Sequence, residues 1–398
     1  MKKKIFFIGD VNSKTNKNTR FLGANKKIRI ILSLLIKQGY DICNINSVPK
    51  MGIRQPMKIK DISFSKNKSI KCLTIPTYIY NKIGRFKNIF DAKEVLEFAI
   101  KKFGKPEFVW CYNAYAFQMN FAYLTKQKYK CPIILEFEDW HFSRSTIFNL
   151  KAVLDWYFWK RAIPSIDYCY AVNPWIEEVM IKHGVKSSIL PGILSKEIVN
   201  MKSKFKTDTK KIINVGYFGG LVAEKGGLLI LELINLMCKR KESNIKFYIT
   251  GNGDLESKFE KLSKSNPKLI KYYGVVDDKK FNKIISKMDI LLNPHYNKKG
   301  VLPFKLLEYM ASGCAVISGP LNLSNSSLNW LLDGIILVDL KAKLWFDEIL
   351  RYKKGQNLNY KKLKKIRKKT IKLYSYERFD RNLYKIINNL NLKFNKMF

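Results

Sequence analysis

Residues 303–318 hold the most restrictive pattern in the chain. Apolar side chains at helical spacing predict a buried stripe formed by Leu306, Leu307, Met310 and Ala311. Gly313 ends this helix, and Ala315–Ile317 is a short, wholly apolar strand. Another apolar strand, Asp289–Asn293, precedes the helix across a polar loop. Strand, loop, helix and strand in this order form one unit of an open parallel sheet with helices on its faces.

The same alternation of strands and helices runs through both halves of the chain. The first series begins with a strand at Lys4–Gly9, whose apolar run stops too early for a signal peptide. The polar residues 196–211 predict a linker, and a second series starts at Ile212. Because 398 residues are long for one core, we expect an α/β protein of two doubly wound, Rossmann-like domains that face a central cleft. The expected parts are residues 1–195, the linker 196–211, residues 212–373, and a C-terminal helix in 374–398 that packs back toward the first domain.

The composition argues against several classes of protein. Seven cysteines are scattered without a Cys-x-x-Cys pair, and the three histidines lie far apart in sequence. We therefore expect reduced thiols in a cytoplasmic protein, with neither a disulfide framework nor a zinc site. No run approaches the roughly 18 consecutive apolar residues of a membrane-spanning helix.

The sequence is strongly basic, with 74 lysines and arginines against 32 aspartates and glutamates and a net charge of +42. From Arg351 onward, sixteen basic residues accompany two acidic ones. The densest run comprises Lys361, Lys362, Lys364, Lys365, Arg367, Lys368, Lys369 and Lys372. Such a surface attracts a polyanion, either an anionic membrane leaflet or a nucleic acid. A solvated basic face without a specific partner is the alternative interpretation.

Two glycine-containing turns follow strands of the second series. Gly219 and Gly220 lead through Lys225 into a helix, and Gly251 and Gly253 follow the next strand. Glycines let a backbone approach a phosphate, a helix start offers free N–H groups, and Lys225 adds a cation. Tight strand-to-helix turns also carry glycines for steric reasons alone, so each turn by itself fits either interpretation. The first turn lacks the Gly-Lys-Ser/Thr of nucleotide hydrolases.

Glu308 is the one carboxylate on the helix predicted within residues 303–318. It follows the helix start by about one turn, at the edge of the sheet where ligands of open α/β domains bind. There it can accept hydrogen bonds from two hydroxyls of a ribose. An ion pair with Lys305, three residues earlier, is the structural alternative. Together with the two glycine turns, Glu308 favours a nucleotide site in the second domain.

The segment after the expected strand Ile133–Phe137 is a second candidate site. It contains the carboxylates of Glu138 and Asp139 and the side chains of Trp140 and His141. Carboxylates and a histidine can act as acids and bases, and a tryptophan can stack on a sugar. A polar loop that satisfies its own backbone is the alternative. Further candidates for lining the cleft are Asn12, Asn25 and Lys26.

Several motifs of the second domain occur in a distinctive order. They are Gly219-Gly220-Leu221, Lys225-Gly226, Thr250-Gly251-Asn252-Gly253, and Pro303 through Glu308-Tyr309-Met310-Ala311-Ser312-Gly313 to Ile317. In this order they resemble the donor domain of family-4 retaining glycosyltransferases, which have the GT-B fold of two Rossmann-like domains. The resemblance is strongest over residues 212–320, and residues 374–379 are similar to the C-terminal helix of that family. The first half is similar in layout alone.

The resemblance implies roles for individual residues. Glu308 would hold the ribose of a nucleotide, and Lys225 would contact its diphosphate. The other residues expected to approach the donor are Gly219, Gly220, Gly251, Asn252, Phe304 and Lys305. Many members have an arginine at the position of Gly220 and a glutamate at the position of Gly300. The candidates to replace the missing positive charge are Lys298, Lys299 and Lys305.

The sequence thus predicts a retaining, hexosyltransferase-type glycosyltransferase. The first domain would bind the acceptor, and the catalytic candidates there are Glu138, Asp139 and His141. The donor would be a nucleotide diphosphate-sugar and the acceptor a lipid-linked or polysaccharide glycan, in the biosynthesis of a surface glycan such as lipopolysaccharide or capsule. No cofactor and no metal ion is expected.

The expected location is the cytoplasm, peripherally at the inner face of the cytoplasmic membrane. The basic C-terminal region would contact the anionic membrane surface, and no specific nucleic acid is expected as a partner. The alternatives are another GT-B enzyme, such as a nucleotide-sugar epimerase or a phosphorylase, and a nucleic-acid-binding protein.

Overall fold

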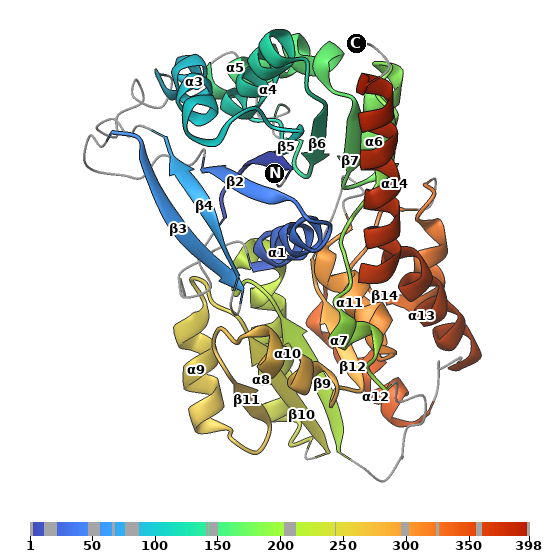
Figure 1. The fold of residues 1–398 in the computed structure, drawn as a ribbon. Helices are drawn as coiled ribbons and strands as arrows, with labels where there is room; N and C mark the ends of the chain where they lie inside the picture. The colour runs from blue at the N-terminus through green and yellow to red at the C-terminus, as the bar shows by residue number, and fades with distance from the viewer. Residues whose placement is uncertain are drawn as a thin grey trace. The chain divides into compact units, whose positions relative to one another are not determined.

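The chain forms two compact units in the computed structural model, Met1–Pro191 with Phe379–Phe398, and Gly192–Arg378. The residues that the structure describes are 3–11, 22–46, 56–65, 68–75, 87–140, 142, 150–202, 212–242, 244–295, 302–323, 326–355 and 360–395. Each unit has its own sheet and its own apolar core (Figure 1).

The sheet of the first unit has the strand order β3-β4-β2-β1-β5-β6-β7-β8. Its strands are β1 (Lys4–Ile8), β2 (Asp41–Asn46), β3 (Lys58–Ser65), β4 (Lys68–Thr74), β5 (Phe108–Tyr112), β6 (Ile133–Phe137), β7 (Tyr168–Ala171) and β8 (Ser187–Ile189). β1 is parallel to β2, where Lys4 pairs with Asp41, and to β5, where Ile5 pairs with Phe108. The predicted first strand therefore lies inside the sheet, as its fully buried apolar residues require.

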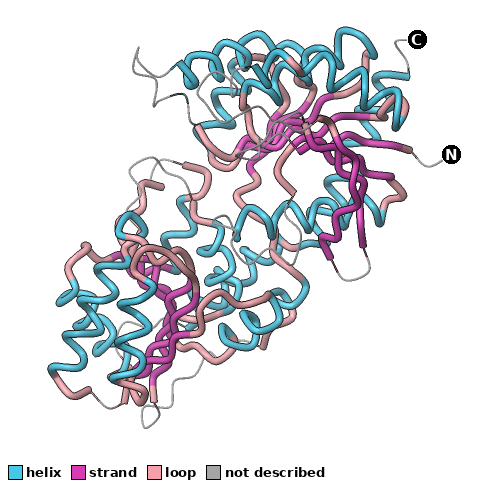
Figure 2. The backbone as a smooth tube through the Cα atoms, turned by 90° about the vertical axis from the view of Figure 1, so that its left-hand side faces the viewer, coloured by secondary structure: helices cyan, strands magenta, loops and turns pink. Residues whose placement is uncertain are grey.

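Helices lie on both faces of this sheet (Figure 2). They are α1 (Leu22–Lys37), α3 (Ala92–Phe103), α4 (Ala116–Tyr129), α5 (Leu150–Ala162), the 3₁₀ turn η2 (Ile163–Ser165), α6 (Pro174–Lys182) and the C-terminal α14 (Tyr376–Asn395). Phe6 and Ile8 share one apolar cluster with residues of α3, α4, α5 and α6. On α14, the ring of Phe379 lies 5.6 Å from the ring of Tyr170, centroid to centroid, and Asp380 pairs with Lys37.

One edge of the first sheet differs from the sequence-based expectation. β3 and β4 pair antiparallel, with Ile62 opposite Ile70, and β4 joins β2 in parallel. The sequence analysis did not identify these strands, nor α5 and β8. Lysines, serines and an aspartate alternate with apolar residues in Lys58–Ser65, as a half-exposed edge strand allows, and the apolar signal is correspondingly weak.

The second unit is a parallel sheet in the order β11-β10-β9-β12-β13-β14. Its strands are β9 (Ile213–Phe218), β10 (Ile245–Thr250), β11 (Ile270–Tyr272), β12 (Ile290–Asn293), β13 (Ala315–Ser318) and β14 (Ile335–Leu337). Because β9 lies between β10 and β12, the strand order reverses there, which makes this the switch point where open α/β sheets bind ligands. Ile290 of β12 pairs with Val215 and with Ala315, so the predicted parallel unit around residues 303–318 is confirmed.

The helices of the second unit cover both faces of its sheet (Figure 2). They are α7 (Lys196–Val199), η3 (Ala223–Lys225), α8 (Gly227–Lys239), α9 (Glu256–Ser265), α10 (Asp278–Ile285), α11 (Phe304–Ser312), η4 (Asn329–Gly334), α12 (Ala342–Lys353) and α13 (Tyr360–Tyr374). The residues of α8 and α12 share an apolar cluster with Val215 and Tyr217 of β9. An α/β fold with two Rossmann-like units therefore agrees with the sequence-based prediction.

The stretch expected to be a linker is in part structured. Residues 196–199 form α7, and Leu194 donates its N–H to the carbonyl of Tyr374 at 2.8 Å. Arg367 of α13 donates to the carbonyls of Met201 at 2.6 Å and of Ala311 at 2.9 Å. Residues 192–202 thus belong to the second unit, whereas residues 203–211 lie outside the described part of the chain.

α13 presents most of its lysines to solvent. Ile366, Thr370 and Tyr374 form its buried stripe, and the exposed residues include Lys361, Lys362, Lys364, Lys365, Lys368, Lys369 and Lys372. Arg367 is not part of this exposed face, because it bonds the backbone of its own unit. Within the described residues, none of the helices is both long and apolar enough to cross a bilayer.

Candidate active site

The turns after β9 and β10 are bonded to each other at the switch point of the second unit. Gly219 donates its N–H to the carbonyl of Thr250 at 3.1 Å, and Leu221 donates to the carbonyl of Asn252 at 2.8 Å. A Cβ at Gly251 would lie 1.8 Å from the carbonyl oxygen of Gly219, so only glycine fits there. The steric interpretation therefore accounts for Gly251, which packs against the first turn.

The first turn itself is overlaid by two lysine amines. A Cβ at Gly219 would lie 3.7 Å from Nζ of Lys305, and one at Gly220 would lie 3.3 Å from Nζ of Lys225. Gly219 has a φ of 145°, which favours glycine, and the hydroxyl of Tyr217 donates to the carbonyl of Gly220 at 2.8 Å. Two cations from η3 and α11 thus meet at the carboxyl end of β9, as an anion-binding turn requires.

The pKa of Lys305 is changed by its burial and by the neighbouring Lys225. Burial, and then the charge of Lys225, lower the pKa of Lys305 to about 7. Its amine lies 5.1 Å from the centroid of the Tyr217 ring. His295 follows β12 beside this pair, and burial, Lys305 and Lys225 lower its pKa as well. Positive charge is therefore destabilised here until an anion is bound.

α11 is fixed against the end of β9. The hydroxyl of Tyr309 accepts from the N–H of Phe218 and donates to its carbonyl, both at 3.2 Å. Glu308, next to Tyr309, is 5% exposed. The ring of Phe304, at the start of the helix, packs closely on Gly192. A Cβ at Gly192 would lie only 1.9 Å from the nearest ring atom. The buried side chain of Glu308 is thus held on a rigid helix next to the switch point.

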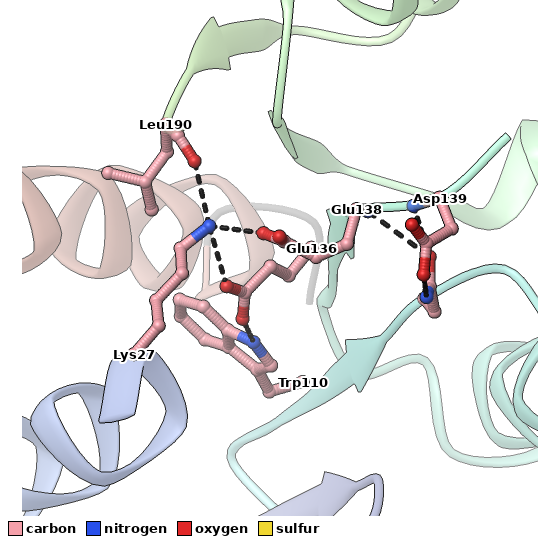
Figure 3. A network of polar contacts seen from close by, with 7 residues as sticks. Lys27, Trp110, Glu136, Glu138, Asp139 and Leu190 are labelled. Carbon is pink, nitrogen blue, oxygen red and sulfur yellow. Dashed lines mark hydrogen bonds and ion pairs between the residues drawn. The ribbon is translucent and has the colours of Figure 1, made fainter. Parts of the chain in front are cut away.

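In the first unit, a buried lysine joins two carboxylates at the end of β6 (Figure 3). Nζ of Lys27 on α1 lies 3.0 Å from Oε1 of Glu136 and also pairs with Glu138. The same amine donates to the carbonyl of Leu190 at 2.7 Å, and Trp110 Nε1 donates to Oε2 of Glu136 at 3.0 Å. The side chains of Lys27 and Glu136 are almost fully buried, and that of Glu138 is 16% exposed.

This network contains one more carboxyl group than it has ammonium groups. Burial raises the pKa of Glu138 to about 7, with Lys27 opposing the rise and Glu136 adding to it. Burial by itself lowers the pKa of Lys27. The charges of Glu138 and Glu136 have the larger combined effect, so the pKa of Lys27 is raised. Lys27 therefore stays charged, and Glu138 can exchange a proton near neutral pH.

Asn113 shapes the backbone around Glu138 and Asp139. Its side-chain oxygen accepts from the N–H of Glu138 at 3.1 Å and of Asp139 at 2.9 Å, and its amide nitrogen donates to Asp139 at 3.3 Å. Asn113 itself has a φ of 70°, a conformation that asparagine tolerates well. It therefore holds an exposed Asp139 beside a half-buried Glu138.

Several residues predicted from the sequence are placed differently from the expectation. Trp140 packs its ring against Trp175 at 4.6 Å and Phe142 at 4.9 Å, in an aromatic cluster of the first unit. Asn25 and Lys26 are both buried. The predicted residues outside the described part of the chain are Asn12, His141, Lys298, Lys299 and Gly300.

Lys27, Asn113 and His295 belong to these sites but were not predicted from the sequence. Lys27 lies on the buried stripe of α1, four residues before Ile31. A charged residue in an apolar stripe indicates that it has a buried partner of opposite charge, because buried charges are usually paired. This indication could be read from the sequence. No comparable local signal marks Asn113 or His295, whose partners come from other parts of the chain.

The comparisons with known proteins concern the second unit and the fold. Residues 212–352 match the family model described as glycosyl transferases group 1. No curated protein matches the sequence. The chain is similar in structure to sucrose-phosphate synthase from Thermosynechococcus elongatus, with a TM-score of 0.68 and 13% identity over 98% of this chain and 99% of that chain.

Two further solved structures are similar over nearly their whole length. Anabaena Alr3699/HepE in complex with UDP and glucose has a TM-score of 0.65 and 10% identity, covering 98% of this chain and 100% of that one. The lipopolysaccharide outer core galactosyltransferase WaaB has a TM-score of 0.60 and 16% identity, covering 96% and 99%. At these identities the likeness establishes the fold.

Residues 212–352 therefore form a glycosyltransferase group 1 domain, and the chain as a whole has the GT-B fold. By this matched domain the chain is similar to glycosyltransferases.

Proposed function

We propose that the protein transfers a sugar from a nucleotide diphosphate-sugar to a glycan acceptor, with retention of configuration. The observation that carries the proposal is the pair of amines of Lys225 and Lys305 over the Gly219–Gly220 turn at the switch point of the second unit. A diphosphate that becomes a leaving group gains negative charge in the transition state. Cations and backbone N–H groups fixed at that point lower the barrier.

In this proposal Glu308 holds the ribose. Its carboxylate is buried on α11, about one turn after the start of that helix, where Lys305 lies. Charge-assisted hydrogen bonds from two hydroxyls suit a buried carboxylate, because they replace the water that it has lost. Lys305 takes over the positive charge that the resemblance expects at the position of Gly220.

The first unit binds the acceptor in this proposal, with Glu138 and Asp139 as its catalytic candidates. Glu138 exchanges a proton near neutral pH, and Asp139 presents an exposed carboxylate that can bind sugar hydroxyls. Lys27 and Asn113 are positioning residues for this pair. His141 stays a sequence-based candidate.

The acceptor class and the location are inferred from surface charge and from the similar proteins. The lysines of α13 suit an anionic membrane surface, and one similar structure is a lipopolysaccharide galactosyltransferase. The free cysteines Cys43, Cys72, Cys111, Cys131, Cys169, Cys238 and Cys314 fit a reducing cytoplasm. We propose a lipid-linked or polysaccharide acceptor of surface glycan biosynthesis, at the inner face of the cytoplasmic membrane.

A thermal-shift panel of UDP, GDP, ADP and CMP tests the donor site, because a ligand that binds the native state alone must stabilise it. One nucleoside diphosphate should raise the melting temperature, and Lys225→Ala should reduce the shift. Lys264 is an exposed residue of α9, and Lys264→Ala is the matched control, which should leave the thermal shift unchanged. With the matching nucleotide-sugar, release of nucleoside diphosphate should require an acceptor and should persist in EDTA. A panel without any shift, or loss of activity in EDTA that magnesium restores, would contradict the respective part of the proposal.

A further inference from the structure

The cluster of Lys225, Lys305 and His295 points to a property of donor binding beyond simple charge attraction. We propose that the donor diphosphate binds together with one proton, which Lys305 takes up from solvent, and that His295 donates a hydrogen bond to the same diphosphate. This inference rests on the proposed donor site. The proton returns to solvent when the nucleoside diphosphate leaves, so binding and release carry equal and opposite proton transfers.

The surroundings of Lys305 supply positive charge and burial before the ligand arrives. From β9 comes Tyr217, whose ring lies beneath the amine, and from η3 comes Lys225. Among the described residues, the titratable groups beside Lys305 are Tyr217, Lys225 and His295, and Glu308 and Tyr309 follow it on its own helix. The charge that acts most strongly on Lys305 is that of Lys225. A positive charge on Lys305 is therefore unfavourable beside Lys225 until an anion is bound.

A bound diphosphate favours the protonated form of Lys305 instead. Its phosphate oxygens approach the Gly219–Gly220 turn, above which both amines lie. Because the pKa of Lys305 is about 7 in the unliganded protein, a large part of its amine is neutral at slightly alkaline pH. A diphosphate raises that pKa again through charge attraction, so the amine gains a proton on binding.

His295 contributes an independent observation. Its Nδ1 is buried and has no hydrogen-bond partner among the residues that the structure describes. The residue follows β12 directly at the switch point, and the carbonyl of Pro294 lies 2.6 Å from where a Cβ of Gly226 would be. This contact places Pro294 against the N-cap of α8, and the charges of Lys305 and Lys225 act on the adjacent His295. A buried polar atom without a partner at a ligand site indicates a hydrogen bond that the ligand completes.

The coupling has a direct consequence for affinity. Binding that takes up one proton weakens as the proton becomes scarce, by up to about tenfold for each pH unit above the pKa of the free group. Affinity for the nucleoside diphosphate should therefore be nearly constant between about pH 6 and 7, where the phosphate is mostly ionised, and should fall between about pH 7 and 9. An enzyme with this property releases its spent nucleotide faster at alkaline pH.

Isothermal titration calorimetry tests the inference on the full chain. UDP, GDP and ADP are titrated at about pH 8 in buffers of different ionisation enthalpy, where a phosphate group with a second pKa of about 6 brings no proton of its own. For the nucleotide that binds, the observed enthalpy should vary with the buffer with a slope close to one proton taken up. Lys305→Arg keeps a cation that never loses its proton, so its slope should be near zero and its affinity should be flat with pH. Lys264→Arg, an exposed lysine of α9, is the matched control and should behave as the unmodified protein.

His295→Asn should lower the affinity about five- to tenfold while leaving most of the proton uptake intact, because Lys305 still gains its proton. A nucleotide that binds the unmodified protein with the same enthalpy in every buffer would overturn the inference and leave the donor site standing. If none of the three nucleotides binds at any pH, the donor site and the inference both fail.

Discussion

Individual carboxylates and amines carry most of the proposed chemistry, and several of them are buried or lie beside another charge. Glu308 is buried on α11, Glu138 shares a lysine with Glu136, and Lys305 competes with Lys225 for positive charge. A buried charge is costly unless a partner compensates it. Residues of this kind therefore report on the ligand that completes them.

Glu308→Gln tests the ribose contact. Charge-assisted bonds are worth roughly 1.5–3 kcal/mol, so affinity for the bound nucleoside diphosphate should fall by about one to two decades. Affinity for its 2′,3′-dideoxy analogue should change little, since the partner hydroxyls are already missing. Calorimetry of both ligands on both proteins gives the comparison. A lower melting temperature with unchanged nucleotide affinity would show instead that Glu308 is structural.

Glu138→Gln tests the buried network of the first unit. The pKa of Glu138 rises on folding from 4.5 to about 7, so the unfolded chain binds fewer protons between these values. The free energy of unfolding should therefore fall as pH rises through this window. In Glu138→Gln this dependence should flatten, because the carboxyl group that titrates is removed, while Lys27 keeps its ion pair with Glu136.

Urea unfolding between about pH 4.5 and 7 measures this effect. Glu178→Gln is the control, since Glu178 pairs with Lys182 on the exposed face of α6. The assignment is wrong if Glu138→Gln and the unmodified protein have parallel stability curves.

At the scale of elements, the turns after β9, β10 and β12 pack on one another and form the proposed donor site. Backbone contacts at Gly251 and Gly226 leave no room for a side chain. They place Lys225 and His295, which come from separate βα connections, beside the same turn. The strand order of the second sheet brings these connections together.

Gly251→Ala tests this packing. Its Cβ would collide with the carbonyl of Gly219, and its φ of 125° is already strained for alanine. We expect a loss of at least about 2 kcal/mol in the free energy of unfolding, together with weaker nucleotide binding. Gly274→Ala, with a φ of 64° and its nearest neighbour 3.8 Å away, should cost only about 1 kcal/mol. Equal losses for the two variants would show that the contact between the turns is unimportant.

At the scale of the whole molecule, a net charge of +42 is distributed unevenly. The exposed face of α13 concentrates lysines, whereas Arg367 on the same helix serves the interior of its unit. The surface of α13 therefore suits an anionic membrane, as proposed above.

Replacing Lys361, Lys364, Lys365, Lys368 and Lys372 by glutamine tests that role. Each lysine near an anionic surface contributes about 1 kcal/mol, so binding to vesicles with anionic lipid should fall at least about tenfold. Replacement of five exposed lysines of the first unit, Lys58, Lys60, Lys101, Lys102 and Lys105, is the matched control. Sedimentation at low and high salt measures both. Equal losses in the two variants, or equal binding to neutral vesicles, would argue against a specific role for α13.

The sequence alone predicted the α/β class, the order of most strands and the parallel unit around residues 303–318. It succeeded there because those elements are buried, and burial on both faces of a parallel sheet imposes an apolar pattern that is local in the chain. The edge strand β3 and its neighbour β4 were not predicted for the opposite reason, since half-exposed strands carry a mixed pattern.

The tertiary structure decided which polar groups meet. Lys27 and Glu136 are 109 positions apart in sequence, and Lys305 reaches a turn that lies more than 80 residues before it. Such contacts depend on strand order and on the packing of turns, neither of which leaves a mark in the neighbouring residues. The sequence therefore determined the two sheets and the motifs at their edges, whereas only the folded chain brought the cations, carboxylates and turns together into sites.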